Sequence, residues 1–158
     1  MLSRLFPRQF DNDYRGYSIA IWLLVPIASI KLLMGCNTIF NTTWVIESAD
    51  RVPLSDYGPK AAHLVIFLFQ SWGLSLALMS LLALIACLRY RSMVPLTYLI
   101  LLAENAGRKL MSLLSPLELA PGGSSPSFAT MVNIGLIAAL LIGFALSLGP
   151  ADEPTNAT

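Results

Sequence analysis

The chain has 158 residues, of which 56% are hydrophobic and only 12% are charged. An ordinary globular chain devotes about a quarter of its residues to charge, so this composition excludes both a water-soluble domain and intrinsic disorder. Ten Lys and Arg residues against nine Asp and Glu residues leave a net charge of +1, which provides no basic surface for nucleic acid. We therefore expect an integral membrane protein that contacts the lipid bilayer and binds no nucleic acid.

Four apolar runs are each long enough to cross about 30 Å of hydrocarbon, which takes roughly 20 helical residues. In chain order they are Tyr17 to Phe40, Ala61 to Leu88, Val94 to Leu114 and Thr130 to Leu148. The segments that connect them are too short to form a separate domain. The sequence therefore predicts an all-α fold, a polytopic four-helix bundle that forms a single transmembrane domain over residues 1–158.

The first span follows a basic segment and contains one charge of its own. Arg4, Arg8 and Arg15 precede it, and the turn after the second span, Arg89 to Arg91, is basic as well. Because positive residues mark cytoplasmic loops, we expect both segments on the cytoplasmic side, and an even number of spans then places both termini there. Lys31 lies about 21 Å into the membrane, counted at about 1.5 Å per helical residue.

The loop from Asn41 to Pro59 then lies on the outer side, and its mixture of charged and apolar residues indicates a cap folded over the bundle. The second span has no formal charge, but it contains His63 and Gln70, which are seven residues apart and so share a helix face. A single His near a membrane interface is most often a hydrogen-bonded boundary residue, although its titration range also suits pH sensing. Both residues are included among the polar candidates.

The third span holds the strongest candidate site. It is interrupted by Glu104, Asn105, Arg108 and Lys109, and a charge within hydrocarbon costs about 3 kcal/mol on insertion scales unless a partner neutralises it. Glu104 and Arg108 are four residues apart, which places them on one helix face with the acid before the base. Their depth is similar to that of Lys31, so packing of the first span against the third predicts a cluster of the three charges inside the bundle.

This polar cluster has three interpretations. It can be a structural clamp that fixes the register of the helices. It can also be a functional site, in which Glu104 transfers protons or the cations receive an anionic head group or substrate. In the third interpretation Arg108 and Lys109 extend to the outer interface and have no special role.

The last span has small residues at every fourth position, namely Gly135, Ala139, Gly143 and Ser147. Such a ridge lets two helices approach closely. It indicates either packing within the bundle, which we favour, or association with a second chain, which would be a membrane-protein partner or another copy of this protein.

The sequence contains no arrangement typical of catalysis or of cofactor binding. It has a single His, and Cys36 and Cys87 fall toward opposite ends of their spans, so we expect neither a metal site nor a disulfide. Nucleophile elbows, phosphate-binding loops and carboxylate pairs are also absent from the sequence. We therefore expect no metal, no cofactor and no catalytic residue.

Four short spans, the segment Ile30-Lys31-Leu32 followed by Gly35, and the basic turn at Arg89 to Arg91 together resemble the DoxX-like group of small bacterial membrane proteins. In that group a carboxylate commonly occurs in the second span, whereas here Gln70 occupies that region and the acid, Glu104, lies in the third. The resemblance implies a bacterial inner-membrane protein that acts as a subunit or helper of a redox or stress-response system.

These observations predict a noncatalytic small integral membrane protein. We expect it to be an accessory subunit or helper of a membrane complex, with a polar cluster that holds a lipid-soluble ligand such as a lipid or a quinone. The alternative is a small membrane enzyme or proton-coupled carrier that acts on a lipid, quinone or sterol-like substrate. In that case Glu104 would exchange a proton, and Lys31, Arg108 or His63 would stabilise negative charge.

Overall fold

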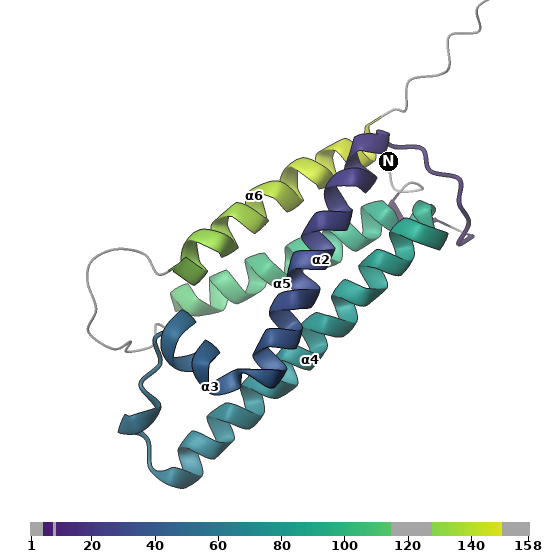
Figure 1. Ribbon diagram of the computed structural model, residues 1–158. Coiled ribbons are helices and arrows are strands. Elements are labelled where there is room, and N and C mark those ends of the chain that lie inside the picture. The colour runs from purple at the N-terminus through teal and green to yellow at the C-terminus, as the bar shows by residue number, and fades with distance from the viewer. Residues whose placement is uncertain (1–4, 8, 115–127, 150–158) are drawn as a thin grey trace, which may run out of the picture.

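The computed structural model describes residues 5–7, 9–114 and 128–149, and over these residues the fold is all-helical, with no strand. Four long helices alternate in direction (Figure 1): α2 (Ser18–Phe40), α4 (Pro59–Arg89), α5 (Val94–Leu114) and α6 (Phe128–Leu148). Helix α2 packs most extensively against α4, and α6 lies against both α2 and α5. The bounds of these helices agree with those of the predicted spans to within two residues.

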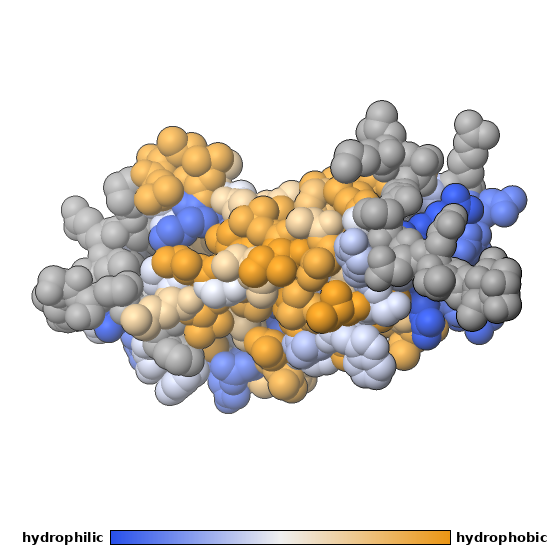
Figure 2. Space-filling view, turned by 90° about the horizontal axis from the view of Figure 1, so that it is seen from above, coloured by the Kyte–Doolittle hydropathy of each residue, from blue (hydrophilic) through white to orange (hydrophobic). Residues whose placement is uncertain are grey.

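Helices α2, α4 and α6 are each long and apolar enough to cross a membrane, as expected for an integral membrane protein. Helix α5 has 21 residues but carries three charged side chains, those of Glu104, Arg108 and Lys109. Figure 2 shows apolar side chains across the middle of one face of the molecule, with hydrophilic residues toward both ends. With 31 residues, α4 is about 46 Å long, so it exceeds the thickness of the hydrocarbon layer.

The core at the centre of the bundle is organised around Tyr98 of α5, which is fully buried. Its hydroxyl donates a hydrogen bond of 2.7 Å to the backbone carbonyl of Ala20 in α2. Its ring fills the space beside Gly143 of α6, where any Cβ atom would overlap with the ring. Apolar side chains such as Leu24 and Leu140 surround it. One aromatic residue therefore joins three helices.

Two glycines allow α2 and α4 to approach each other closely. A Cβ atom on Gly35 would lie 2.7 Å from the backbone nitrogen of Ala77, and one on Gly73 would lie 2.9 Å from the Cβ of Thr38. Both distances are shorter than van der Waals contact allows. The α2–α4 contact is therefore a second small-residue contact, in addition to the ridge predicted in the last span.

The loop between α2 and α4 forms the predicted cap. It contains the short helix α3 (Thr42–Trp44), the π-helical turn η1 (Val45–Ala49) and the 3-10 turn η2 (Leu54–Asp56). Ile46, Val52 and Leu54 form a small buried core of their own, which packs against the first turns of α4. Burial of these apolar side chains holds the cap over one end of the bundle.

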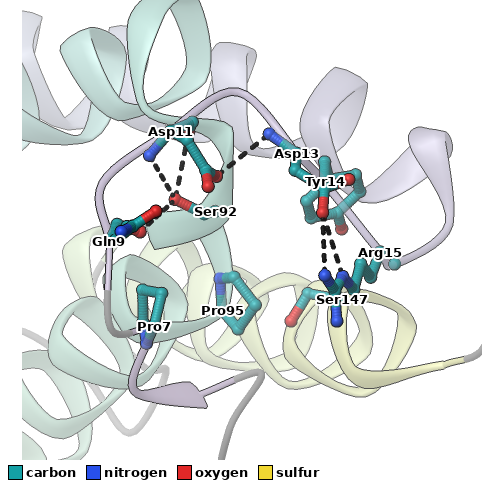
Figure 3. Close-up of a pocket in the computed structure, with 10 residues that line it drawn as sticks. Pro7, Gln9, Asp11, Asp13, Tyr14, Arg15, Ser92, Pro95 and Ser147 are labelled. Carbon is teal, nitrogen blue, oxygen red and sulfur yellow. Dashed lines mark hydrogen bonds and ion pairs between the residues drawn. The ribbon is translucent and has the colours of Figure 1, made fainter.

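The amino-terminal segment is attached to the opposite end of the bundle (Figure 3). Ser92, in the 3-10 turn η3 (Arg91–Met93), accepts a hydrogen bond of 3.1 Å from the backbone N–H of Asp11, and its own hydroxyl donates one of 3.0 Å to the Asp11 carbonyl. The backbone N–H of Tyr17 donates to the carbonyl of Leu146 in α6 at 3.3 Å. A cavity of about 380 Å³ lies beneath this segment. The amino-terminal segment, the basic turn and the end of α6 therefore share one end of the molecule.

Candidate functional site

The structure brings Lys31 and Glu104 together from α2 and α5. The Lys31 Nζ lies 2.8 Å from Glu104 Oε2, and the lysine side chain is only 1% exposed. An unpaired ammonium group at such a position is energetically very costly, because it loses its hydration shell and gains no other interaction in return. The contact therefore neutralises a charge that the fold places in its interior.

Arg108 completes the cluster from one turn further along α5. Its Nε lies 2.7 Å from Glu104 Oε1, an ion pair that is not aligned as a hydrogen bond. Its Nη2 donates at 3.2 Å to Oδ1 of Asn105 and at 3.4 Å to Oδ1 of Asn133 in α6. Each carboxylate oxygen of Glu104 thus faces a cation, and the polar contacts connect α2, α5 and α6.

Asn105 lies beneath Arg108 and is 2% exposed. Its side-chain amide donates a hydrogen bond of 2.9 Å to the carbonyl of Leu101, while its oxygen accepts from Arg108. A buried amide is stable only if its donors and acceptors have partners. Asn105 therefore supports the position of the Arg108 guanidinium.

Trp72 of α4 forms the other side of the arginine site. The Arg108 Cζ lies 4.6 Å from the centre of the Trp72 ring, which is within the range of a cation–π interaction. Phe69 packs edge-on against the same indole, with 5.7 Å between the ring centres. The Trp72 Nε1–H is buried and has no hydrogen-bond partner among the described residues.

A large groove lies beside the cluster and next to the cap. Its volume is about 1290 Å³, and residues from α2, α4, α5, α6 and the cap line it. Most of the lining is apolar and includes Ile30, Met34, Val45, Phe69, Leu76 and Met111. Glu104, Arg108 and Asn133 form part of its polar floor. The site therefore combines a long apolar surface with a small, charged polar region.

Two further charged residues line the groove. Lys109 follows Arg108 in α5, and it forms no ion pair with any residue in the described part of the chain. Asp50 comes from the end of η1 in the cap. Burial raises the pKa of the Asp50 carboxyl above its ordinary value, and the positive charge of Arg108 opposes this shift. The cap thus brings an acidic group toward the cationic side of the cluster.

His63 and Gln70, which the sequence analysis grouped with the cluster, lie outside it. Both are exposed on α4 and neither lines the groove. A helix turns by about 100° per residue, so the face that presents Trp72 to the groove directs Gln70 away from it. His63 shares the face of Gln70 and points away as well. The prediction that His63 and Gln70 join the cluster was therefore wrong. A polar residue in an apolar span does not indicate which face of the helix meets the groove.

The small-residue ridge of α6 packs against other helices only along part of its length. Gly143 and Ser147 are buried, and Ala139 packs against the core. A Cβ atom on Gly135, in contrast, would meet no atom of the described chain within 4 Å. The end of the ridge near Gly143 packs within the molecule, whereas the end at Gly135 makes no close helix contact in the described structure.

Three residues of the site, Trp72, Asn133 and Asp50, were not predicted from the sequence. Two of them carry a recognisable signal, because a Trp deep in a span and an Asn in an otherwise apolar span both require a reason. Asp50 had no such signal, since its approach to the groove depends on how the cap folds. Comparison with family models, curated proteins and solved structures gave no match to this chain.

Proposed function

We propose that this protein is a noncatalytic integral membrane protein that holds a lipid-soluble ligand in the groove and acts as an accessory subunit of a membrane complex. The groove itself is the observation that carries this proposal. Ligand sites are typically concave and mostly apolar, with a few convergent polar groups. The groove has this character, with the cluster around Glu104 and Arg108 at its floor.

Helix α5 acts in this proposal as a fourth membrane span. Its charges are compatible with that position because Glu104 is paired with Lys31 and Arg108 inside the molecule. The basic turn at Arg89 and the segment with Arg15 lie at one end of the bundle, which supports a cytoplasmic location for both. We extend the proposal to a bacterial inner membrane with both termini in the cytoplasm, in keeping with the resemblance to the DoxX-like group.

A binding role suits Glu104 better than a catalytic one. A general base needs a carboxylate oxygen that can approach the proton it removes. In the structure, Lys31 lies against one oxygen of Glu104 and Arg108 lies against the other, at 2.8 Å and 2.7 Å. Protonation of Glu104 would leave these two cations without their counter-ion. The cluster is therefore built to remain charged and to fix the polar end of a ligand.

A bulky side chain at Gly107 tests whether the groove binds a ligand. Gly107 lines the groove in α5, and a Cβ atom there would meet no described atom within 4 Å, so Gly107→Phe should fill space without disrupting the helix packing. The matched control is Gly135→Phe, since Gly135 is also helical, also faces open space and does not line the groove. Both variants would be purified in mild detergent, and the bound lipids and quinones identified by native mass spectrometry.

We expect the wild-type protein and Gly135→Phe to retain a bound small molecule and Gly107→Phe to lose it. Equal retention by all three proteins would overturn ligand binding in the groove. The accessory role has a separate test. Gentle extraction from the native membrane should recover the chain in a stoichiometric complex with other proteins, and recovery as a monomer alone would contradict that role.

A further inference from the structure

Two residues that line the groove, Trp72 and Lys109, each carry a donor group with no partner among the described residues. The Trp72 Nε1–H is buried and has no partner in the described part of the chain. A buried donor without a partner is unfavourable by the desolvation cost of the group. Lys109 adds a cation that lines the groove and forms no ion pair with a described residue. A ligand that satisfies both groups must present hydrogen-bond acceptors.

The charges around the groove favour an anionic ligand. Five charged side chains line it or lie directly beneath it, namely the cations Lys31, Arg108 and Lys109 and the anions Asp50 and Glu104. Three cations against two anions leave one positive charge in excess. The charges of Lys31, Arg108, Glu104 and Asp50 sum to zero, so the excess charge corresponds to Lys109.

The shape of the groove favours a ligand with long apolar chains. Its volume of about 1290 Å³ exceeds the range of about 300–1,000 Å³ that is common for small-molecule pockets. Ile30, Trp44 and Met111 line it and are 48%, 60% and 63% exposed, so it is open along one side. Lys109 lies five residues before the end of α5, about 8 Å along the helix axis, which is a depth at which a lipid head group can reach it.

We infer that the groove binds one anionic phospholipid, whose phosphate is held between Lys109, Arg108 and the Trp72 indole N–H and whose acyl chains lie along the apolar lining. This inference rests on the proposed ligand-binding function and specifies the class of ligand. A phosphate supplies acceptor oxygens for the two donor groups that have no partner in the described part of the chain, and a lysine binds it as a point charge. The acyl chains cover the apolar side chains that the helices leave open.

The full-length protein would be reconstituted in nanodiscs with equal amounts of phosphatidylglycerol and phosphatidylcholine that carry the same acyl chains. After release from the nanodiscs, native mass spectrometry would count each lipid retained by the wild-type protein, Lys109→Gln, Trp72→Phe and the control Lys60→Gln. Lys60 is exposed, belongs to α4 at the capped end and does not line the groove. Circular dichroism would establish that the variants are folded.

We expect the wild-type protein and Lys60→Gln to retain phosphatidylglycerol in preference to phosphatidylcholine. Lys109→Gln should reduce that preference by about tenfold, the effect of one charge-assisted hydrogen bond. Trp72→Phe removes the N–H donor and leaves a smaller aromatic ring beside Arg108, so we expect a reduction of about threefold.

Other results would overturn the inference. Equal retention of both lipids, or a preference that survives in Lys109→Gln, would show that the site does not select the phosphate charge. Displacement of phosphatidylglycerol by an added neutral quinone would show a different ligand class, and occupation of the groove by a second copy of the chain would show a protein interface. In the first three cases ligand binding in the groove still stands. Loss of binding by Gly107→Phe remains the separate test of the proposed function.

Discussion

Tyr98 donates a 2.7 Å hydrogen bond to the carbonyl of Ala20, and its ring at the same time covers Gly143. The hydroxyl and the ring therefore make separable contributions to the packing of α2, α5 and α6. Loss of the hydroxyl removes one buried hydrogen bond, which is typically worth about 1 kcal/mol. A Cβ atom at position 143 would overlap with the Tyr98 ring, so Gly143→Ala disturbs the packing of the ring and not the hydrogen bond.

We expect Tyr98→Phe to lower the free energy of unfolding by about 1 kcal/mol and Gly143→Ala to lower it by about 1–3 kcal/mol through overpacking. Gly135→Ala is the control, and it should be neutral or slightly stabilising because its Cβ meets open space and Ala favours the helix. Denaturation in mild detergent micelles, followed by circular dichroism, measures all three. A Gly143→Ala protein as stable as wild type would contradict the tight packing described for this position.

The charged cluster predicts an order of destabilisation. Glu104→Gln leaves both Lys31 and Arg108 without their counter-ion, so the free energy of unfolding should fall by about 3–5 kcal/mol. Lys31→Met should cost less, because Arg108 still neutralises Glu104. The double variant Lys31→Met with Glu104→Gln should lose less free energy of unfolding than the two single variants lose together. Additive effects in the same denaturation assay would show that the two side chains are not coupled.

Asp50 predicts a pH-dependent contribution to stability. Because burial raises the pKa of its carboxyl above the ordinary value of 3.8, the folded state binds the proton more tightly than the unfolded state does. Its contribution to stability is therefore most favourable below pH 3.8 and decreases as the pH rises through the folded-state pKa. Asp50→Asn removes this loss, so the variant should unfold at a higher temperature than the wild-type protein at neutral pH.

The difference between wild type and Asp50→Asn should disappear in acid, where the carboxyl is protonated in both states. Asp56→Asn, which changes an exposed carboxylate in the same cap, is the control and should alter the melting temperature little. A wild-type protein more stable than Asp50→Asn at neutral pH would reverse the sign and would indicate that the attraction to Arg108 outweighs burial.

Ser92 holds the amino-terminal segment against the turn between α4 and α5. Ser92→Ala removes the hydroxyl that accepts from the N–H of Asp11 and donates to its carbonyl, while the backbone hydrogen bond from the Ser92 N–H at 3.3 Å can persist. We expect trypsin to cleave next to Arg15 several-fold faster in this variant, because local opening exposes the segment. Ser55→Ala, an exposed Ser in the cap with only a local hydrogen bond, should leave that cleavage rate unchanged.

The bounds of the helices could be predicted closely from the sequence, because each long helix coincides with a continuous run of mostly apolar residues. The approach of Lys31 to Glu104 was also predictable, since isolated charges at similar depth require partners. The sequence did not predict which side of each helix faces the groove. Gln70 and Trp72 are only two residues apart, and only the packing of α4 against its neighbours decides which of them meets the groove. Asp50 depends on the cap, whose short helices have no periodic pattern.

The length of α4 has a consequence for how a molecule reaches the groove. With 31 residues, α4 is longer than the hydrocarbon layer is thick, and the cap packs on its first turns. In the proposed membrane arrangement the cap therefore stands at the boundary between lipid and water. In that proposed arrangement the open side of the groove, with Ile30 and Met111, would face neighbouring acyl chains and not the aqueous phase. A ligand would enter by lateral diffusion within one leaflet, and the occupancy of the groove would follow the composition of that leaflet.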